Sequence, residues 1–592
     1  MAKLQIVRGR AGRGRFLGSA ARTAAAVFLS VCFSFFAGAQ APSAQSAAAP
    51  IEAALPERIT FWSDYPADVL ADTLVSRMSD EELLAQIFMF GWAGQEPSEL
   101  LNRWVVERGL GSVKVFGWNT DNTTLVAESV VSLQQKSQQR RFQIPLFVAT
   151  DQEGGWIRHV KGETSDTPGN LAIGASGYAA DAWFSGYYIS RELRALGINM
   201  NFAPTVDLYT NHDSSVIGPR SFGEDGDSVG VLGAAFTAGS LAAGVIPTAK
   251  HFPGHGDTGV DSHGNLPVIS IDLDTLLNRE LVPFKYLIAE KIPAIMSGHL
   301  SFPQIVPNGE PASLSKVFLT DILRTKLGYE GLIITDDMMM NGATMYAGNL
   351  SSAFRMAIEA GNDIIISSTT AQLNEALWRS NLELMKTSAA FKARVADAAR
   401  RVIHAKLVYF KSGTAVPLYP DVSKIAESIP DPDGADFFLS QACRSISVFK
   451  GGSVPYAPAA GERILLAGQK QFPSFFSEAK LRYPDAKFVQ FNYAMGPNET
   501  EWMSDYLAGF AKDFDTVIIC VADAASAAVA ERLRQLDVKT IVISVLAPFP
   551  AMKCDWADTV LLAYSYSPYS FAAVFGLLAG EFSARGTLPL SP

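Results

Sequence analysis

Eight short hydrophobic runs recur between residues 86 and 366, each followed by polar or glycine-rich residues. Almost continuous hydrophobicity over four to six residues is typical of parallel strands buried on both faces. The stretches between the runs are long enough for a crossover helix each time. The runs lie at residues 86–90, 112–116, 145–149, 199–202, 245–249, 293–296, 331–335 and 363–366. Eight strand-helix units predict an α/β fold of the TIM type, a (β/α)8 barrel. An open doubly wound sheet is the alternative, but no GxGxxG motif follows the first run.

The segment before the seventh run illustrates the helical pattern. Phe318, Ile322 and Leu323 form an apolar stripe at helical spacing. Ser315 precedes the stripe as a candidate N-cap, and Gly328 follows it as a stop signal. We therefore expect a helix here that is capped by Ser315.

The rest of the chain divides by composition. Residues 61–411 would form the barrel, which is the catalytic domain, and the proline-rich residues 412–435 an interdomain linker. Residues 436–592 would form a smaller C-terminal α/β domain, resembling an αβα sandwich. Its predicted strands are 463–468, 516–520, 540–544 and 559–563.

The N-terminus has the pattern of an export signal. Residues 1–39 combine six basic side chains, an apolar run and a small-x-small ending at Ala39, which is typical of a secretory signal peptide. A membrane anchor is the alternative, but the run is shorter than the ~20 residues needed to span a bilayer. Residues 40–60 would be a flexible leader. We therefore expect an exported protein, periplasmic or extracellular, with no stable membrane insertion after cleavage.

Charge and cysteine content narrow the possible partners. The formal net charge of −10 becomes more negative once the basic signal is removed, which argues against nucleic acid as a partner. Cys443, Cys520 and Cys554 would remain, with no CxxC spacing, so no metal framework and no cofactor are expected. We expect these three cysteines to be buried and to pack as small hydrophobic side chains, although one disulfide between two of them is possible.

Polar residues gather where the predicted strands end. They are residues 151–155, Asp207, residues 250–257, His299 and the pair Asp336–Asp337. Any one of these could simply cap the next helix. The active site of a (β/α)8 barrel lies at the carboxyl ends of its strands. Five such clusters at one rim therefore predict an active site.

The run Lys250–Asp257, followed by residues 258–263, resembles the signature of glycoside hydrolase family 3, and more narrowly of its β-N-acetylglucosaminidases (β-N-acetylhexosaminidases). The resemblance extends from about residue 80 to residue 406 and resumes near the C-terminus. Its other segments are 151–155, 168–172, 220–222, 334–338 and 586–589. It implies removal of terminal non-reducing β-linked N-acetylglucosamine, with a carbohydrate such as a GlcNAc-containing glycan or cell-wall fragment as the partner.

The resemblance also implies catalytic roles. Asp336 would be the nucleophile that forms a covalent glycosyl intermediate, with Asp337 as the alternative. Neighbouring residues on a strand face opposite sides, so only one of the two aspartates can point into the site, and the resemblance assigns that position to Asp336. His263 would be the acid/base, paired with Asp261, because imidazole titrates near neutrality. The alternative is a loop in which Asp261 and Ser262 merely form turns.

The implied substrate ligands are polar side chains on the same rim. They are Asp151, Arg220, Lys250, His251 and Arg158. Lys250 could also pair with Asp207 or Asp151. At the position where the family often has an arginine, this chain has His159. Arg158 lies one residue earlier and would take the place of that arginine.

Several other functions stay open. Within the family, these are a β-glucosidase or a phosphorolytic acetylglucosaminidase. Outside it, one is an inactive glycan-binding surface protein. Another is a metallohydrolase using His251, His255 and His263, although Pro253-Gly254 would break a helix carrying such ligands. The natural substrate could be a muropeptide from cell-wall recycling, a chitin oligosaccharide or a glycoprotein glycan.

Overall fold

The computed structural model describes residues 56–591 apart from 215, 262 and 263. The predicted signal peptide, most of the predicted leader and His263 lie outside the described residues. Contacts divide the chain into Met1–Arg58 and Ile59–Pro592, and the following description concerns the second unit. Within the described residues no helix is long and apolar enough to cross a bilayer.

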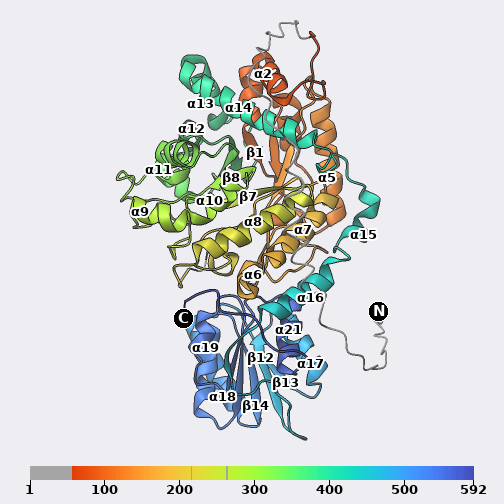
Figure 1. Cartoon of the computed structure of the whole chain (residues 1–592), viewed down its shortest axis with the longest axis vertical. Helices are drawn as coiled ribbons and strands as arrows, with labels where there is room; N and C mark the ends of the chain where they lie inside the picture. The colour runs from red at the N-terminus through yellow and green to blue at the C-terminus, as the bar shows by residue number, and fades with distance from the viewer. Residues whose placement is uncertain (1–55, 215, 262–263, 592) are drawn as a thin grey trace, which may run out of the picture. The chain divides into compact units, whose positions relative to one another are not determined.

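The N-terminal part is a closed barrel of eight parallel strands in the order β1-β10-β9-β8-β7-β6-β3-β2 (Figure 1). The strands are β1 (Phe88–Phe90), β2 (Ser112–Lys114), β3 (Phe147–Thr150), β6 (Met200–Asn201), β7 (Ile246–Phe252), β8 (Ala294–Ser297), β9 (Leu332–Asp337) and β10 (Ile364–Ser367). Each one coincides with a predicted run, so the barrel is confirmed.

The barrel strands are hydrophobic throughout because both of their faces are buried. In β10, Ile364 and Ile366 join the cluster inside the barrel, whereas Ile365 packs into the larger cluster outside it. Burying one such side chain contributes roughly 1.5–3 kcal/mol. Val402, from the last barrel helix, belongs to the inner cluster. Because hydrophobic side chains fill the inside of the barrel, polar side chains collect at the ends of the strands.

Helices surround the barrel. The α-helices are α2 (Ala67–Arg77), α3 (Asp80–Gln86), α4 (Glu99–Arg103), α5 (Thr123–Gln138), α6 (Asn170–Ser176), α7 (Ala179–Ala195), α8 (Gly226–Ala242), α9 (Leu273–Thr275), α10 (Val282–Ala289), α11 (Asn341–Ala347), α12 (Leu350–Ala360), α13 (Ala376–Thr387) and α14 (Ala389–Phe410). The π-helical segments are η1 (Trp104–Arg108), η4 (Leu276–Glu280) and η6 (Val317–Lys326), and a short hairpin pairs β4 (Gln152–Gly154) with β5 (Ile157–Arg158).

The helix predicted before the seventh run is present as η6, with its apolar stripe buried. The extended Ser315 holds the predicted N-cap position, because the helical backbone begins at Lys316 and the Ser315 carbonyl oxygen accepts the backbone N–H of Leu319. The side-chain cap is absent, since the buried Ser315 hydroxyl makes no hydrogen bond with any described residue.

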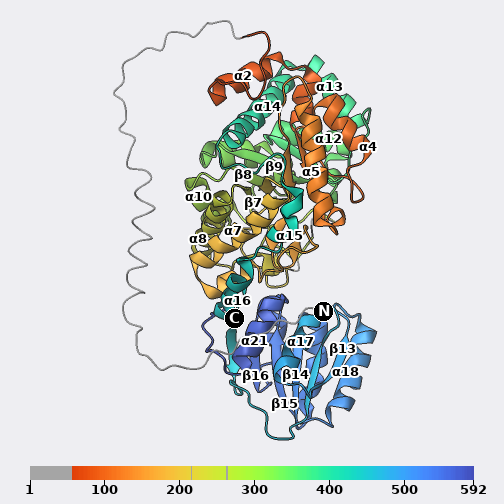
Figure 2. The same ribbon diagram turned by 90° about the vertical axis from the view of Figure 1, so that its right-hand side faces the viewer.

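The C-terminal part is a six-stranded sheet in the order β11-β16-β15-β14-β12-β13. Its strands are β11 (Ser447–Gly451), β12 (Ile464–Gln469), β13 (Lys487–Phe491), β14 (Thr516–Val521), β15 (Lys539–Ser544) and β16 (Thr559–Leu562). Helices cover both faces, with α18 (Pro497–Ala511) and α19 (Ala524–Glu531) opposite α16 (Gly434–Ser445), α17 (Pro473–Arg482) and α21 (Pro568–Leu578) (Figures 1 and 2). The helix α20 (Phe549–Met552) follows β15.

The four predicted C-terminal strands are all present, but two strands were missed. These are β11 and β13, the two edges of the sheet. Most of their residues are exposed, so neither shows the continuous hydrophobic run of a central strand. The predicted disulfide alternative is wrong, since Cys443, Cys520 and Cys554 are free thiols.

The segment predicted as a linker holds a 3-10 turn (Val422–Lys424) and α15 (Ile425–Ser428). It is tied to the barrel, because the backbone N–H of Asp431 donates to Glu192 Oε1 at 2.9 Å. The exact domain boundaries stay predictions.

Candidate active site

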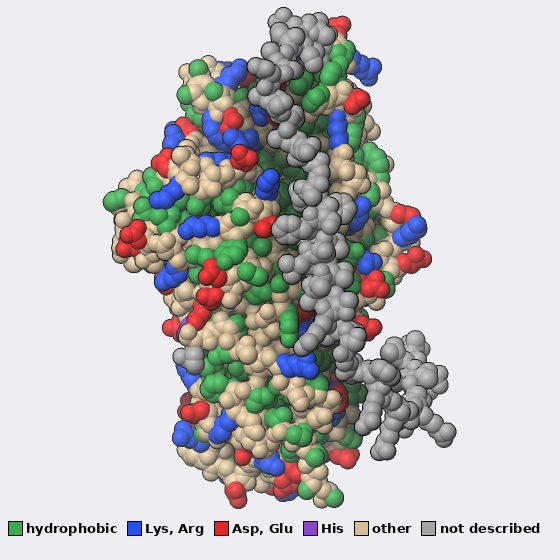
Figure 3. Space-filling view, in the orientation of Figure 1, with side chains coloured by type: hydrophobic (Ala, Val, Ile, Leu, Met, Phe, Trp, Pro, Cys, Tyr) green, Lys and Arg blue, Asp and Glu red, His purple; other side chains and the backbone are tan. Residues whose placement is uncertain are grey.

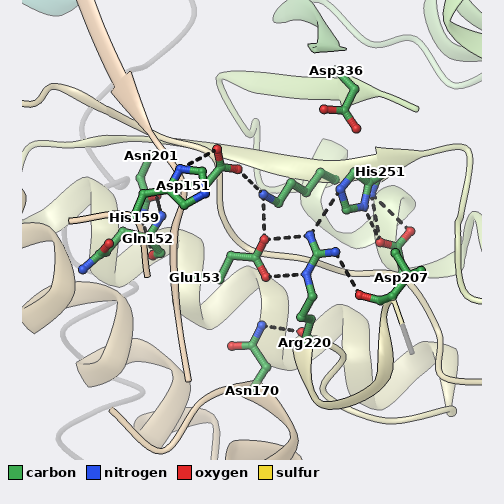
Figure 4. Close-up of polar contacts among 12 residues, drawn as sticks. Asp151, Gln152, Glu153, His159, Asn170, Asn201, Asp207, Arg220, His251 and Asp336 are labelled. Atoms are coloured by element: carbon green, nitrogen blue, oxygen red, sulfur yellow. Dashed lines mark hydrogen bonds and ion pairs between the residues drawn. The ribbon is translucent and has the colours of Figure 1, made fainter. Parts of the chain in front are cut away.

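A cavity of about 190 Å³ opens at the carboxyl ends of the barrel strands. Figure 4 shows its polar contacts. Its lining residues come from many separate segments: Lys114, Phe116, Asp151, Glu153, Ile157, His159, Val216, Arg220, Lys250, His251, His255, Asp336, Asp337 and Met340. The structure thus brings together Asp151, Arg220, Lys250, His251 and Asp336 at one cavity, and their roles in binding and catalysis stay predictions.

Asp151 follows β3 and lies between two lysines. Lys114 Nζ, at the end of β2, is 2.8 Å from Asp151 Oδ2, and Lys250, in β7, contacts Oδ1. Burial by itself would raise the pKa of Asp151, but the charges of Lys114 and Lys250 hold that pKa well below its usual range. Asp151 is therefore ionised at neutral pH and can accept hydrogen bonds from hydroxyl groups.

Glu153 forms a second ion-paired group behind Asp151. Its carboxylate accepts two bonds from Arg220, at 2.8 and 3.0 Å, and Lys250 Nζ lies 2.7 Å away. Burial opposes ionisation, yet Arg220 and Lys250 lower the pKa of Glu153 to about 2. The pattern of residues did not assign Glu153 a role, although it lies within the Asp-Gln-Glu-Gly-Gly run. Lys250 pairs with Asp151, and the alternative pairing with Asp207 is wrong.

Asp207 instead orients His251. Its carboxylate lies 2.6 Å from His251 Nδ1 and also accepts the backbone N–H groups of His251 and His255, the latter at 2.7 Å. Arg220 Nη2 lies 3.3 Å from His251 Nε2. A guanidinium can only donate, so Nε2 accepts and Nδ1–H donates to Asp207. This arrangement fixes the orientation of the His251 ring.

Asp336 lies near the end of β9 and is partly exposed in the cavity. Its Oδ1 accepts the backbone N–H of Asp337 at 2.7 Å. Burial would raise its pKa, but His251, His299 and Lys114 lower the pKa to about 2. Among the described residues no lysine or arginine forms an ion pair with Asp336, and Figure 4 shows it apart from the ion-paired network. It is an ionised carboxylate available to a ligand.

Asp337 has a different environment. Its Oδ1 accepts backbone N–H groups of Met339 at 3.0 Å and Ser368 at 2.9 Å. The bond from Ser368 joins the ends of β9 and β10. His299 Nε2 also lies 3.1 Å from the Asp337 carbonyl oxygen. Asp337 thus supports the loop that carries Asp336.

The loop after β7 carries the proposed acid/base pair. Asp261 is exposed, and its carbonyl oxygen accepts the backbone N–H groups of residues 264 and 265. The proposed acid/base His263 lies outside the described residues. Nearer to β7, the Arg279 guanidinium contacts Asp257, and its Nε lies 2.6 Å from Oε1 of the buried Glu280. These two ion pairs hold the base of the loop.

Arg158 is not brought to the cavity. Its guanidinium donates to the Thr164 carbonyl oxygen at 2.7 Å, whereas His159 lines the cavity 3.5 Å from Asp151 Oδ2. Burial lowers the pKa of His159 to about 4, so this imidazole is neutral at pH 7. Across residues 56–591, leaving aside 215, 262 and 263, no group of three or more His, Cys, Asp or Glu side chains is placed to hold a metal ion.

A closed (β/α)8 barrel with a polar cavity at the carboxyl ends of its strands defines a barrel enzyme. The signature described as Glycosyl hydrolase family 3 N terminal domain matches residues 79–405. The chain therefore belongs to glycosyl hydrolase family 3.

Curated relatives agree with this assignment. The chain is 37% identical over 289 residues to beta-hexosaminidase A of Pseudoalteromonas piscicida, covering 46% of this chain and 47% of that protein. It is 31% identical over 310 residues to the beta-hexosaminidase of Stenotrophomonas maltophilia (strain K279a), covering 51% of this chain and 89% of that protein. The matched region thus spans about half the length of the first of these relatives.

Solved structures extend the likeness to both parts of the chain. A family 3 β-N-acetylglucosaminidase from Paenibacillus sp. str. FPU-7 aligns with a TM-score of 0.79 and 28% identity, covering 87% of this chain and 99% of that one. A β-glucoside phosphorylase aligns with a TM-score of 0.74 and 21% identity, covering 89% of this chain and 96% of that one. The second likeness shows only the fold.

Proposed function

We propose that this protein is a retaining exo-β-N-acetylglucosaminidase that hydrolyses terminal non-reducing β-linked GlcNAc. The observation that carries the proposal is Asp336, an ionised carboxylate in the cavity with no ion-pair partner among the described residues. The neighbouring acids are engaged: Asp151 and Glu153 with lysine or arginine, Asp207 with His251, and Asp337 with two backbone N–H groups. Asp336 is thus the carboxylate best placed to attack a bound sugar.

The mechanism has two steps. Asp336 forms a bond to the anomeric carbon as the bond to the leaving oxygen breaks, and His263 gives its proton to that oxygen. Water then attacks the same carbon, His263 takes the water's proton, and the bond to Asp336 breaks. Two inversions retain the anomeric configuration. Asp261, two residues before His263, would hold the imidazole and stabilise its charged form.

The cavity suits one uncharged sugar. Asp151 can accept hydrogen bonds from ring hydroxyls, while Lys250 and Arg220 can donate to them. These cations are already paired with Asp151 and Glu153, so a neutral ligand leaves the charge balance of the cavity intact. Relatives that are named beta-hexosaminidases favour N-acetylglucosamine as that sugar. Export is part of the proposal and rests on the N-terminal pattern.

The test compares Asp336→Asn with Asp337→Asn. Asp336→Asn should abolish turnover of an aryl β-GlcNAc glycoside and stay folded, whereas Asp337→Asn should chiefly lower the melting temperature. Wild-type kcat/KM should favour the β-GlcNAc over the matched β-glucoside, and NMR should detect the β-anomer first. An inverted first product, or full activity in Asp336→Asn, would refute the assignment.

A further inference from the structure

A row of exposed aromatic rings runs along α18 in the C-terminal sheet domain. Trp502, Tyr506 and Phe510 recur every fourth residue and are 61%, 46% and 38% exposed. The ring centroids of Trp502 and Tyr506 are 5.3 Å apart and nearly parallel, and those of Tyr506 and Phe510 are 6.2 Å apart. Parallel rings that overlapped fully would have their centroids about 3.5 Å apart. The longer distances mean that neighbouring rings overlap only in part, so part of each face stays open to a ligand. We call these residues the aromatic row.

The aromatic row leads to a second cavity. Phe510 contacts Phe514, with ring centroids 5.4 Å apart, and Phe514 lines a cavity of about 500 Å³ beside the amino ends of β12 and β13. Tyr483 also lines it. This side chain is only 4% exposed, and its hydroxyl has no hydrogen-bond partner among the described residues. That oxygen is shielded from solvent, so a ligand in this open cavity would meet the charged side chains of the lining rather than the Tyr483 hydroxyl.

The charges around these features favour a neutral ligand. Three acidic and three basic side chains line the cavity: Glu462, Asp485, Asp513, Arg463, Arg482 and Lys487. Acidic residues accompany the aromatic row on α18 itself, at Glu499, Glu501 and Asp505. Nucleic acids and anionic lipid surfaces require clustered basic residues, which the helix lacks. On the face that Figure 3 shows, basic and acidic side chains are also interspersed.

We propose that the aromatic row and the adjoining cavity form an ancillary binding surface for a neutral β-linked polysaccharide. Pyranose rings present apolar C–H faces that pack against aromatic faces, while their hydroxyls bond to carboxylate and basic side chains. Eight helical residues span about 12 Å, so the row can contact successive sugar rings. The surface shares no lining residue with the catalytic cavity.

The identity of the polymer rests on the proposed function: a chain that trims terminal GlcNAc would be held on a β-linked GlcNAc polymer. Binding the polymer at a second site raises the effective concentration of its ends near the barrel. The surface should therefore increase activity on insoluble polymer and leave activity on small soluble glycosides unchanged.

The test is sedimentation of the full chain with insoluble chitin. Trp502→Ala combined with Tyr506→Ala should weaken binding about tenfold or more, as expected for two lost ring contacts. Tyr419→Ala is the matched control, because Tyr419 is 49% exposed and lies outside the aromatic row. The double variant should keep wild-type kcat/KM on an aryl β-GlcNAc glycoside.

The outcomes separate the possibilities. Equal sedimentation of wild type and double variant would overturn the proposal. The proposal would also be overturned if light scattering showed a dimer of the wild type but not of the double variant, and both still bound chitin. A second copy of the chain would then cover the aromatic row. Row-dependent chitin binding with no hydrolysis of any β-GlcNAc glycoside would support the surface and refute only the proposed function.

Discussion

Replacing Glu153 by glutamine tests the ion-paired network that underlies the cavity. The substitution keeps the shape of the side chain and removes its charge. Arg220 then loses its carboxylate partner, and Lys250 keeps only Asp151. Because the side chain is only 1% exposed, water cannot replace the lost interaction.

The size of the effect follows from the pKa. Arg220 and Lys250 lower the pKa of Glu153 from 4.5 to about 2 despite its burial. At 1.36 kcal/mol per unit this shift corresponds to about 3 kcal/mol of stability at pH 7. Breaking a buried ion pair typically costs 3–5 kcal/mol, which agrees. A depressed carboxyl pKa stabilises the fold above the unfolded value, so the contribution should fade as the pH drops from about 4.5 toward 2.

The assay is urea unfolding of wild type and Glu153→Gln at pH 7, 5, 4 and 3. The variant should be less stable by about 3 kcal/mol at pH 7, and the difference should shrink below pH 4.5. Glu107→Gln is the control, since Glu107 pairs with Arg103 on the surface and should show no measurable change. A cost below about 1 kcal/mol, or the same cost at pH 3 and pH 7, would refute the ion-pair reasoning.

Three further predictions concern protons. His263→Ala should slow hydrolysis of natural glycosides by roughly 10²–10⁴-fold, but should slow hydrolysis of aryl glycosides whose phenols leave unaided much less. Added azide should restore turnover of the variant. Equal losses on all leaving groups would exclude an acid/base role for His263. Changing C-terminal glutamates to glutamine should leave kcat on soluble substrate within about tenfold, and a larger loss rescued by an activated leaving group would move the acid/base there. The positions are Glu462, Glu478, Glu499, Glu501, Glu531 and Glu581. Burial raises the pKa of Glu280 to about 7, so stability should fall as the pH rises from 4.5 to 7, and unfolding of Glu280→Gln should lack that fall.

The sequence by itself determined the barrel, because each strand is buried on both faces and so carries its own hydrophobic run. It also determined the position of Asp336, which directly follows such a run in β9. The edge strands β11 and β13 escaped prediction because solvent covers most of their residues. Local pattern reports burial, and these strands are largely unburied.

Only the tertiary structure decided which charges meet. Lys114 is a polar residue within a strand, and it reaches Asp151 because β2 pairs with β3 in a register that places Lys114 beside Ala149. In the β4–β5 hairpin, Gln152 pairs with Arg158, and it is His159 that lines the cavity. Partners such as Lys250 and Asp151 are 99 positions apart in the chain. Periodicity is local, whereas barrel closure and strand register bring these distant charges together.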